Sequence, residues 1–268
     1  MSWSTKYYRD FHPDFSLGAR SRMNPRWVLI AAILFFSLVG GAQEQSVVPL
    51  KLEPHHHLVL HNDFVKVYSV RVQPQDSVLL HKHEFDAIGI MLSDAEITVR
   101  VPGKPDSHQK VVAGQLRLQQ AGYIHSTVID SDTAYRNVTV ELLLPQQERR
   151  NLCGSVISGQ PLNCRSAQTD SSASSEQPQF QTNQTKISLI RLKPQHSVTL
   201  MNASAQSRLI VALDDTAVVN GANSSPKVLR SGDVLWRDSN GSGEVFENTG
   251  SKEARLITFV FTNEHSAE

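Results

Sequence analysis

VYSVRVQPQDSVLL at residues 67–80 and ISLIRLKPQHSVTL at residues 187–200 decide the fold, because these two stretches repeat each other. They align without gaps and share a Pro-Gln-x-Ser-Val run. Chance similarity between two β-strands would match apolar positions but not this run. Matches continue at nearly the same offset in Ile90 with Ile210, Asp94 with Asp214, Gly114 with Gly232, and Arg136 with Arg255. The sequence therefore predicts one domain present in two copies.

Both copies consist of short runs of Val, Ile, Leu and Thr, such as EITVRV and RLITFVF, separated by turn residues. Alternation of this kind is typical of strands in an all-β barrel or sandwich, and no amphipathic helix is visible. We expect a first barrel over residues 48–148 and a second over residues 184–263. Residues 149–183 between them combine two cysteines with a Ser- and Gln-rich stretch, which indicates a linker.

The charge of the chain argues against two classes of partner. Lys and Arg number 26, and Asp and Glu also number 26, so the protein has no net field that would attract nucleic acid or an anionic membrane. We therefore expect a small-molecule ligand or substrate, no nucleic acid, and no membrane contact once the N-terminal segment is removed. The sequence leaves open whether the chain forms a homo-oligomer.

The N-terminal region contains an apolar block, VLIAAILFFSLVGGA at residues 28–42, preceded by three arginines. Small residues before Gln43 suit cleavage, so residues 1–42 are interpreted as a signal peptide of a periplasmic or secreted protein. An uncleaved anchor is the alternative, although the block is short for a bilayer span, which needs about 20 residues. The charged region before it is unusually long, which makes Met23 an alternative start.

Cys153 and Cys164 are the two cysteines of the chain. In an exported protein a disulfide is the favoured state of such a pair, and two free thiols are the alternative. A zinc site is not expected here, because no CxxC motif or nearby histidine accompanies them.

His81 and His83 stand two residues apart at the end of an apolar strand, so both side chains project from the same face. In a closed barrel that face can be the interior, where two imidazoles can share one metal ion. His125 is the candidate for a third ligand; it follows Gly114 and Gly122, which permit tight turns.

These residues resemble the two motifs of the cupin superfamily, whose first motif centres on H-x-H and whose second ends in P-x-G-x-x-H. The resemblance covers nearly all of residues 50–145 and, in weakened form, residues 184–263. It implies two tandem double-stranded β-helix (jelly-roll) barrels, a bicupin, with a single divalent metal ion (Fe, Mn, Zn or Ni) held by His81, His83 and His125.

The chain departs from the cupin motifs at several positions, which are Gln75 for a glycine, Gln120 for the proline, Ile129 for an asparagine, and Ala87 or Ile88 for the glutamate ligand. Asp86 and Glu84 are the nearest carboxylates to the missing glutamate. Glu84 should face away from the histidines, whereas Asp86 could turn inward across a bend as a ligand or a hydrogen-bonding partner.

The other histidines show no such pattern. His55, His56 and His57 form a tract that we expect to lie in solvent, with weak metal binding as the alternative. In the second copy the ligand positions fall on Met201, Ala203, and Gly243 or Glu244, and the Asp86 position falls on Gln206. The second barrel is therefore expected to bind no metal.

Two functions remain open at the level of sequence. In one, the first barrel is a metal-dependent oxygenase, isomerase or decarboxylase acting on a small molecule. In the other, it is a non-catalytic binding protein or sensor for a small ligand or metal. No general base is recognisable, although Tyr123, Thr127 and Glu141 are candidate polar lining residues. A solvent-reachable cavity with convergent polar groups would favour the enzyme.

Overall fold

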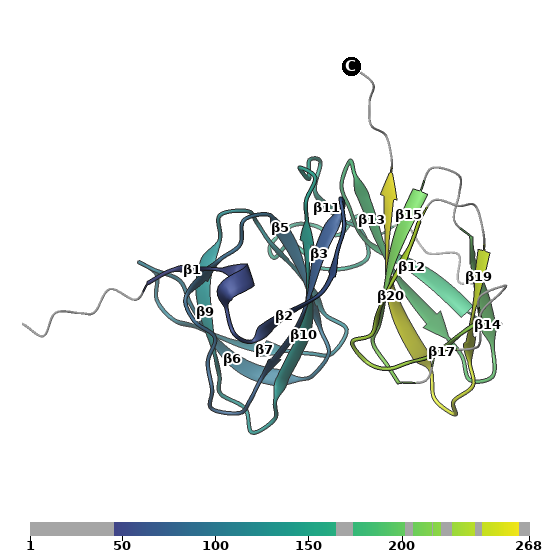
Figure 1. Ribbon diagram of the computed structural model, residues 1–268, viewed down its shortest axis with the longest axis horizontal. Helices are drawn as coiled ribbons and strands as arrows, with labels where there is room; N and C mark the ends of the chain where they lie inside the picture. Colours follow the sequence, from purple (N-terminus) through teal and green to yellow (C-terminus); the bar gives the residue numbers. More distant parts are fainter. Residues whose placement is uncertain are drawn as a thin grey trace, which may run out of the picture. The chain divides into compact units, whose positions relative to one another are not determined.

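The computed structural model describes residues 46–164, 174–201, 206–215, 217–220, 227–238 and 243–262 (Figure 1). The predicted signal peptide, the alternative start at Met23, and Ala203 lie outside these residues. Within them the chain is almost entirely β, and the one helical segment is a 3-10 turn, η2, at Leu50–Leu52. No helix in the described part is long and apolar enough to cross a membrane. The all-β prediction is confirmed.

The first barrel is built from two five-stranded sheets. One has the order β1-β4-β9-β6-β7 and the other the order β2-β3-β10-β5-β8. The strands are β1 (Val48–Pro49), β2 (His56–His61), β3 (Val65–Val72), β4 (His81–Lys82), β5 (Asp86–Met91), β6 (Ala95–Arg100), β7 (Ser107–Val111), β8 (Leu116–Gln119), β9 (Ile124–Ile129) and β10 (Tyr135–Leu142). Inward side chains of both sheets, among them Tyr68, Val72 and Ile129, form one apolar core. The histidines must therefore share the interior with this core.

The second barrel pairs a six-stranded sheet, β11-β12-β13-β20-β15-β18, with a four-stranded sheet, β14-β19-β16-β17. The strands are β11 (Arg150–Asn151), β12 (Ser174–Gln181), β13 (Thr185–Leu192), β14 (Ser197–Met201), β15 (Gln206–Ala212), β16 (Ala217–Asn220), β17 (Lys227–Leu229), β18 (Val234–Arg237), β19 (Gly243–Asn248) and β20 (Ala254–Thr262). An apolar core that includes Ile190, Leu192 and Phe246 fills it.

The stretch expected to be a linker, residues 149–183, is not a linker throughout. Its Ser- and Gln-rich part contains β12, which pairs antiparallel with β13 and shifts register between Pro178 and Phe180. Phe180 is fully buried. A proline is tolerated at such a bulge, and burial of Phe180 adds about 1.5 to 3 kcal/mol to the backbone pairing of β12 with β13.

Strand pairing agrees with the alignment of the two copies. His81 pairs with His125 across β4 and β9, and Met201 pairs with Gly243 across β14 and β19 at the aligned positions. Gln75 and Gln195, also aligned, both adopt positive φ, 62° and 60°. This conformation favours glycine, which explains why the cupin motif has glycine where Gln75 stands. The turn is therefore conserved between the copies even though its usual residue is absent.

Candidate metal centre

Two neighbouring strands bring the three predicted histidines together. His81 begins β4 and is the cross-strand neighbour of His125 in β9. His83 follows β4 directly, and its backbone N–H donates to the Tyr123 carbonyl while its own carbonyl accepts from the Gly122 N–H. Alternation along β4 then turns His81 and His83 to the same inner face. All three side chains lie inside the barrel, with residue exposures of 1%, 1% and 6%.

The imidazoles converge on one point. One ring nitrogen from each lies within 4.8 Å of the others, and the Nε2 atoms of His83 and His125 are 3.1 Å apart. The ring centroid of His81 is 4.5 Å from that of His125 and 5.2 Å from that of His83. Nitrogens bound to one first-row ion at about 2.1 Å sit about 3.0 to 3.4 Å apart, so the spacing fits a shared ion with little movement.

The hydrogen bonds of these rings leave a ligand atom of His81 free. His81 Nδ1 donates to the Leu79 carbonyl at 2.9 Å, which leaves its buried Nε2 with no partner. The nitrogen of His83 that faces His125 is Nε2, while its Nδ1 is buried without a hydrogen bond. Buried nitrogens without partners are costly, and a backbone bond on one ring nitrogen is what orients a metal-binding histidine. These residues therefore fit a metal ion.

Burial keeps the three rings neutral. Desolvation, followed by the charge of neighbouring histidines, lowers the pKa of His83 to about 3 and that of His125 well below its usual value. Desolvation also lowers the pKa of His81 to about 4, partly opposed by the Leu79 bond. Neutral imidazole is the form that binds metal, so near neutral pH no proton has to leave these rings first.

The structure does not bring Asp86 to the histidines. One of its oxygens pairs with Arg149 (Nη2 at 2.6 Å, Nε at 2.8 Å), and the other accepts the backbone N–H of Ala121 at 2.9 Å. The expectation of Asp86 as a ligand is therefore not supported by the geometry. Asp86 is not a hydrogen-bonding partner of the histidines either; it holds the backbone N–H of Ala121 in the turn before Tyr123 and His125, a role that the sequence did not indicate.

A buried carboxylate that the sequence did not reveal lies beside the histidines. Glu53 accepts from His56 Nδ1 at 2.5 Å, from His55 Nδ1 at 3.0 Å and from the Leu79 backbone at 3.2 Å. Burial alone would raise the pKa of Glu53, but the bonds from His56 and His55 prevail and lower it to about 2. The His56 ring lies 5.0 Å from that of His81. The expectation that this tract is solvated is therefore wrong for His56, whose side chain is only 6% exposed.

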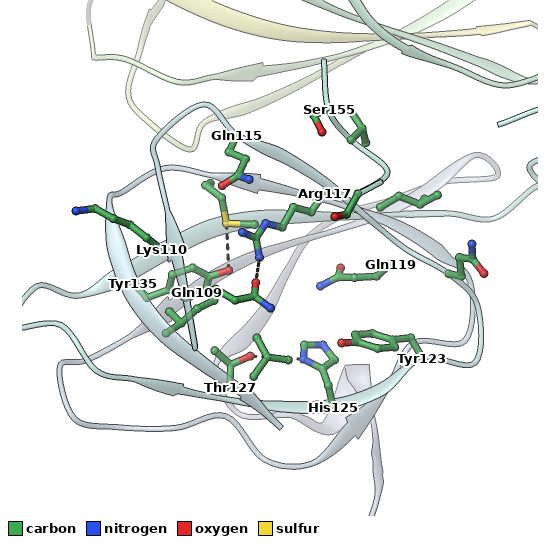
Figure 2. A pocket seen from close by; sticks show the side chains of 17 residues that line it. Gln109, Lys110, Gln115, Arg117, Gln119, Tyr123, His125, Thr127, Tyr135 and Ser155 are labelled. Atoms are coloured by element: carbon green, nitrogen blue, oxygen red, sulfur yellow. Dashed lines mark hydrogen bonds between the residues drawn. The ribbon is translucent and has the colours of Figure 1, made fainter. Parts of the chain in front are cut away.

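A cavity of about 740 Å³ adjoins His125 (Figure 2). Its lining includes His125, Tyr123 and Thr127, and the Tyr123 ring stacks on that of His125 at 4.7 Å. Four of its residues also line a small hollow of about 30 Å³ between the imidazoles, and these are Gln119, His125, Thr127 and Tyr135. A small molecule in the cavity would therefore contact His125, and the small hollow beyond it leads to His81 and His83.

Two other expectations concern the walls of this cavity. Glu141 is not among its lining residues and is instead buried beside the Tyr68 hydroxyl, which donates to it at 3.4 Å. Burial raises the pKa of Glu141.

Cys153 and Cys164 form the predicted disulfide. The loop that it closes contributes Ser155, Val156 and Ser158 to the cavity wall.

No protein-family model and no curated protein matches the chain. Solved structures do. AerE from Microcystis aeruginosa matches with a TM-score of 0.55 and 14% identity over 79% of this chain and 94% of its own. Salicylate 1,2-dioxygenase from Pseudoaminobacter salicylatoxidans, in complex with gentisate, matches with a TM-score of 0.55 and 11% identity. This match covers 88% of the present chain and 80% of the dioxygenase chain. An oxalate decarboxylase matches with a TM-score of 0.50 and 14% identity, over 76% of the present chain and 70% of its own. At these identities the likeness concerns the fold, and it shows a cupin fold, as the sequence motifs predicted.

Proposed function

We propose that the first barrel binds one divalent transition-metal ion through His81, His83 and His125 and acts on a small molecule in the adjoining cavity. The observation that carries the proposal is the convergence of three buried, neutral imidazoles on one point at the end of an open cavity. Cupin-fold relatives named as a dioxygenase and a decarboxylase give the same fold a catalytic precedent. Oxygenase, isomerase and decarboxylase chemistry are the candidate reaction classes.

The residues at the site would have distinct roles in holding the ion and contacting a substrate. The three histidines would hold the ion, which would supply Lewis acidity or oxygen activation when bound. The Leu79 carbonyl fixes the orientation of His81, and Asp86 fastens the turn that carries Tyr123 and His125. Tyr123 and Thr127 would contact a substrate beside His125.

Binding without turnover is the second candidate, and one observation favours it. The lining of the cavity contains no aspartate or glutamate, so a carboxylate general base is absent from its walls as the structure describes them. In an enzyme, proton transfer by a residue of the wall would then fall to Tyr123 or Tyr135.

Turnover separates the two candidates. The metal-loaded and the chelated protein would be incubated with a panel of small organic acids and their amides, while oxygen uptake, carbon dioxide release and product masses are followed. Metal-dependent appearance of a product supports the enzyme. Saturable binding of a panel member with no product over many hours supports the binding protein and refutes catalysis on that class.

We also propose that the protein acts outside the cytoplasm. The arginine-flanked apolar block before Gln43 supports export. The disulfide between Cys153 and Cys164 adds support, because such bonds persist in oxidising compartments.

A further inference from the structure

The charged residues that line the cavity are all positive. Among the lining residues, Lys110 and Arg117 are cationic, and no lining residue in the described part of the chain is acidic. Lys110 points to solvent with 73% of its side chain exposed and lies 4.0 Å from Glu96. Its charge is therefore already screened and partly compensated. Arg117 is therefore the cation whose charge acts inside the cavity.

The Arg117 guanidinium lacks an anionic partner. Arg117 lies in β8, is half-buried, and donates through Nη1 to the neutral Gln109 side chain. None of the ion pairs among the described residues involves it. Figure 2 shows its side chain extending into the cavity towards Gln109, on the same side as Gln119 and across from His125.

A partly desolvated cation without a counter-charge costs free energy, and an anion entering the cavity would offset that cost. The planar fork of arginine matches a carboxylate, to which it can donate two parallel hydrogen bonds. The rest of the wall is uncharged. Met91, Leu118 and Tyr123 offer apolar surface, while Gln119 and Thr127 lead towards the imidazoles. The surroundings therefore suit an organic body with one negative charge.

We propose that the cavity binds a small organic monocarboxylate, with the carboxylate on Arg117 and the body directed towards His81, His83 and His125. This names the substrate class of the proposed function and rests on it for the reaction. Binding of the carboxylate itself requires only Arg117 and the cavity, so the two ideas fail separately.

The test uses benzoate and its neutral analogue benzamide, titrated by NMR into the mature protein with and without metal. We expect benzoate to bind at least tenfold more tightly than benzamide. Arg117→Gln should weaken benzoate at least tenfold and leave benzamide unchanged, and Arg117→Lys should fall between because it keeps the charge but loses the fork. Lys110→Gln is the matched control and should change benzoate affinity less than threefold.

Several results would overturn the proposal: no benzoate binding, no preference over benzamide, or equal losses in Arg117→Gln and Lys110→Gln. Metal content, measured on the same samples, separates the two claims. If the protein holds one ion per chain but binds benzoate no more tightly than benzamide, the carboxylate site is refuted and the metal centre is retained. Arg117-dependent benzoate binding in a protein that takes up no metal retains the carboxylate site and rejects the metal function.

Discussion

Replacing Glu53 by glutamine should destabilise the protein in a strongly pH-dependent way. The Glu53 carboxylate is 1% exposed and holds His55, His56 and the Leu79 backbone. Its pKa falls from 4.5 to about 2 in the folded protein. At 1.36 kcal/mol per pKa unit this corresponds to about 3 kcal/mol of stability carried by the ionised form.

The sign follows from the lowered pKa. The stabilisation is complete above the unfolded value of 4.5 and is lost as the pH falls from there through about 2. Glu53→Gln should therefore cost about 3 kcal/mol at pH 6, less at pH 3.5, and almost nothing near pH 2. The raised pKa of His55 acts the opposite way: its contribution is complete below 6.5 and is lost as the pH rises through the folded value, so pH 6 is a suitable reference.

Urea unfolding of the chelated protein, followed by circular dichroism from pH 2 to pH 7, measures this difference without a metal contribution. Glu96→Gln is the control, because Glu96 is 65% exposed and lies 4.0 Å from Lys110. We expect it to cost less than about 1 kcal/mol at every pH. A Glu53→Gln cost below about 1 kcal/mol at pH 6, or one that does not shrink towards pH 2, would refute the role assigned to this network.

Two further variants and one sequencing experiment test other parts of the protein. Asp86→Asn should loosen the turn before His125 and weaken metal binding by about tenfold or more, measured by competition with a chelator; unchanged affinity would remove its positioning role. Cys153→Ser with Cys164→Ser should cost about 2 to 3 kcal/mol in urea unfolding, and a cost near zero would show that the bridge is idle. N-terminal sequencing of exported protein should begin near Gln43, whereas an intact Met23 terminus in the membrane fraction would contradict cleavage.

The strands and the shared face of His81 and His83 were predictable because both depend on short-range regularities, whereas the position of His125, 42 residues from His83, came from the resemblance to the cupin motifs. Strand alternation turns His81 and His83 to one face whatever the rest of the chain does. Gly114 marks the turn that leads into β8 and Gly122 the turn that leads into β9, and both adopt positive φ, at 90° and 85°. Such signals are local, so they can be read from one sequence.

The features that the sequence did not predict depend on pairs of residues that are distant in sequence. The partner of Asp86 is Arg149, 63 residues away, and no local pattern marks it. Glu53 and His56 stand in a polar tract that looks solvated, and they are buried because Glu53 lies against Leu79 and His56 against His81, both distant in sequence. The unpaired charge of Arg117 likewise becomes apparent only when the cavity around it is assembled.

Metal analysis of the mature protein, purified without chelator, tests the central claim most directly. We expect close to one first-row divalent ion per chain in the wild type, and loss of stoichiometric metal in His81→Ala and in His125→Ala, with folding checked by circular dichroism. His196→Ala is the matched control: this histidine lies in an exposed turn of the second barrel, where its Nδ1 contacts the Pro194 carbonyl, and it should leave the metal in place. Full metal occupancy in a folded His81→Ala, His83→Ala double variant would contradict the account.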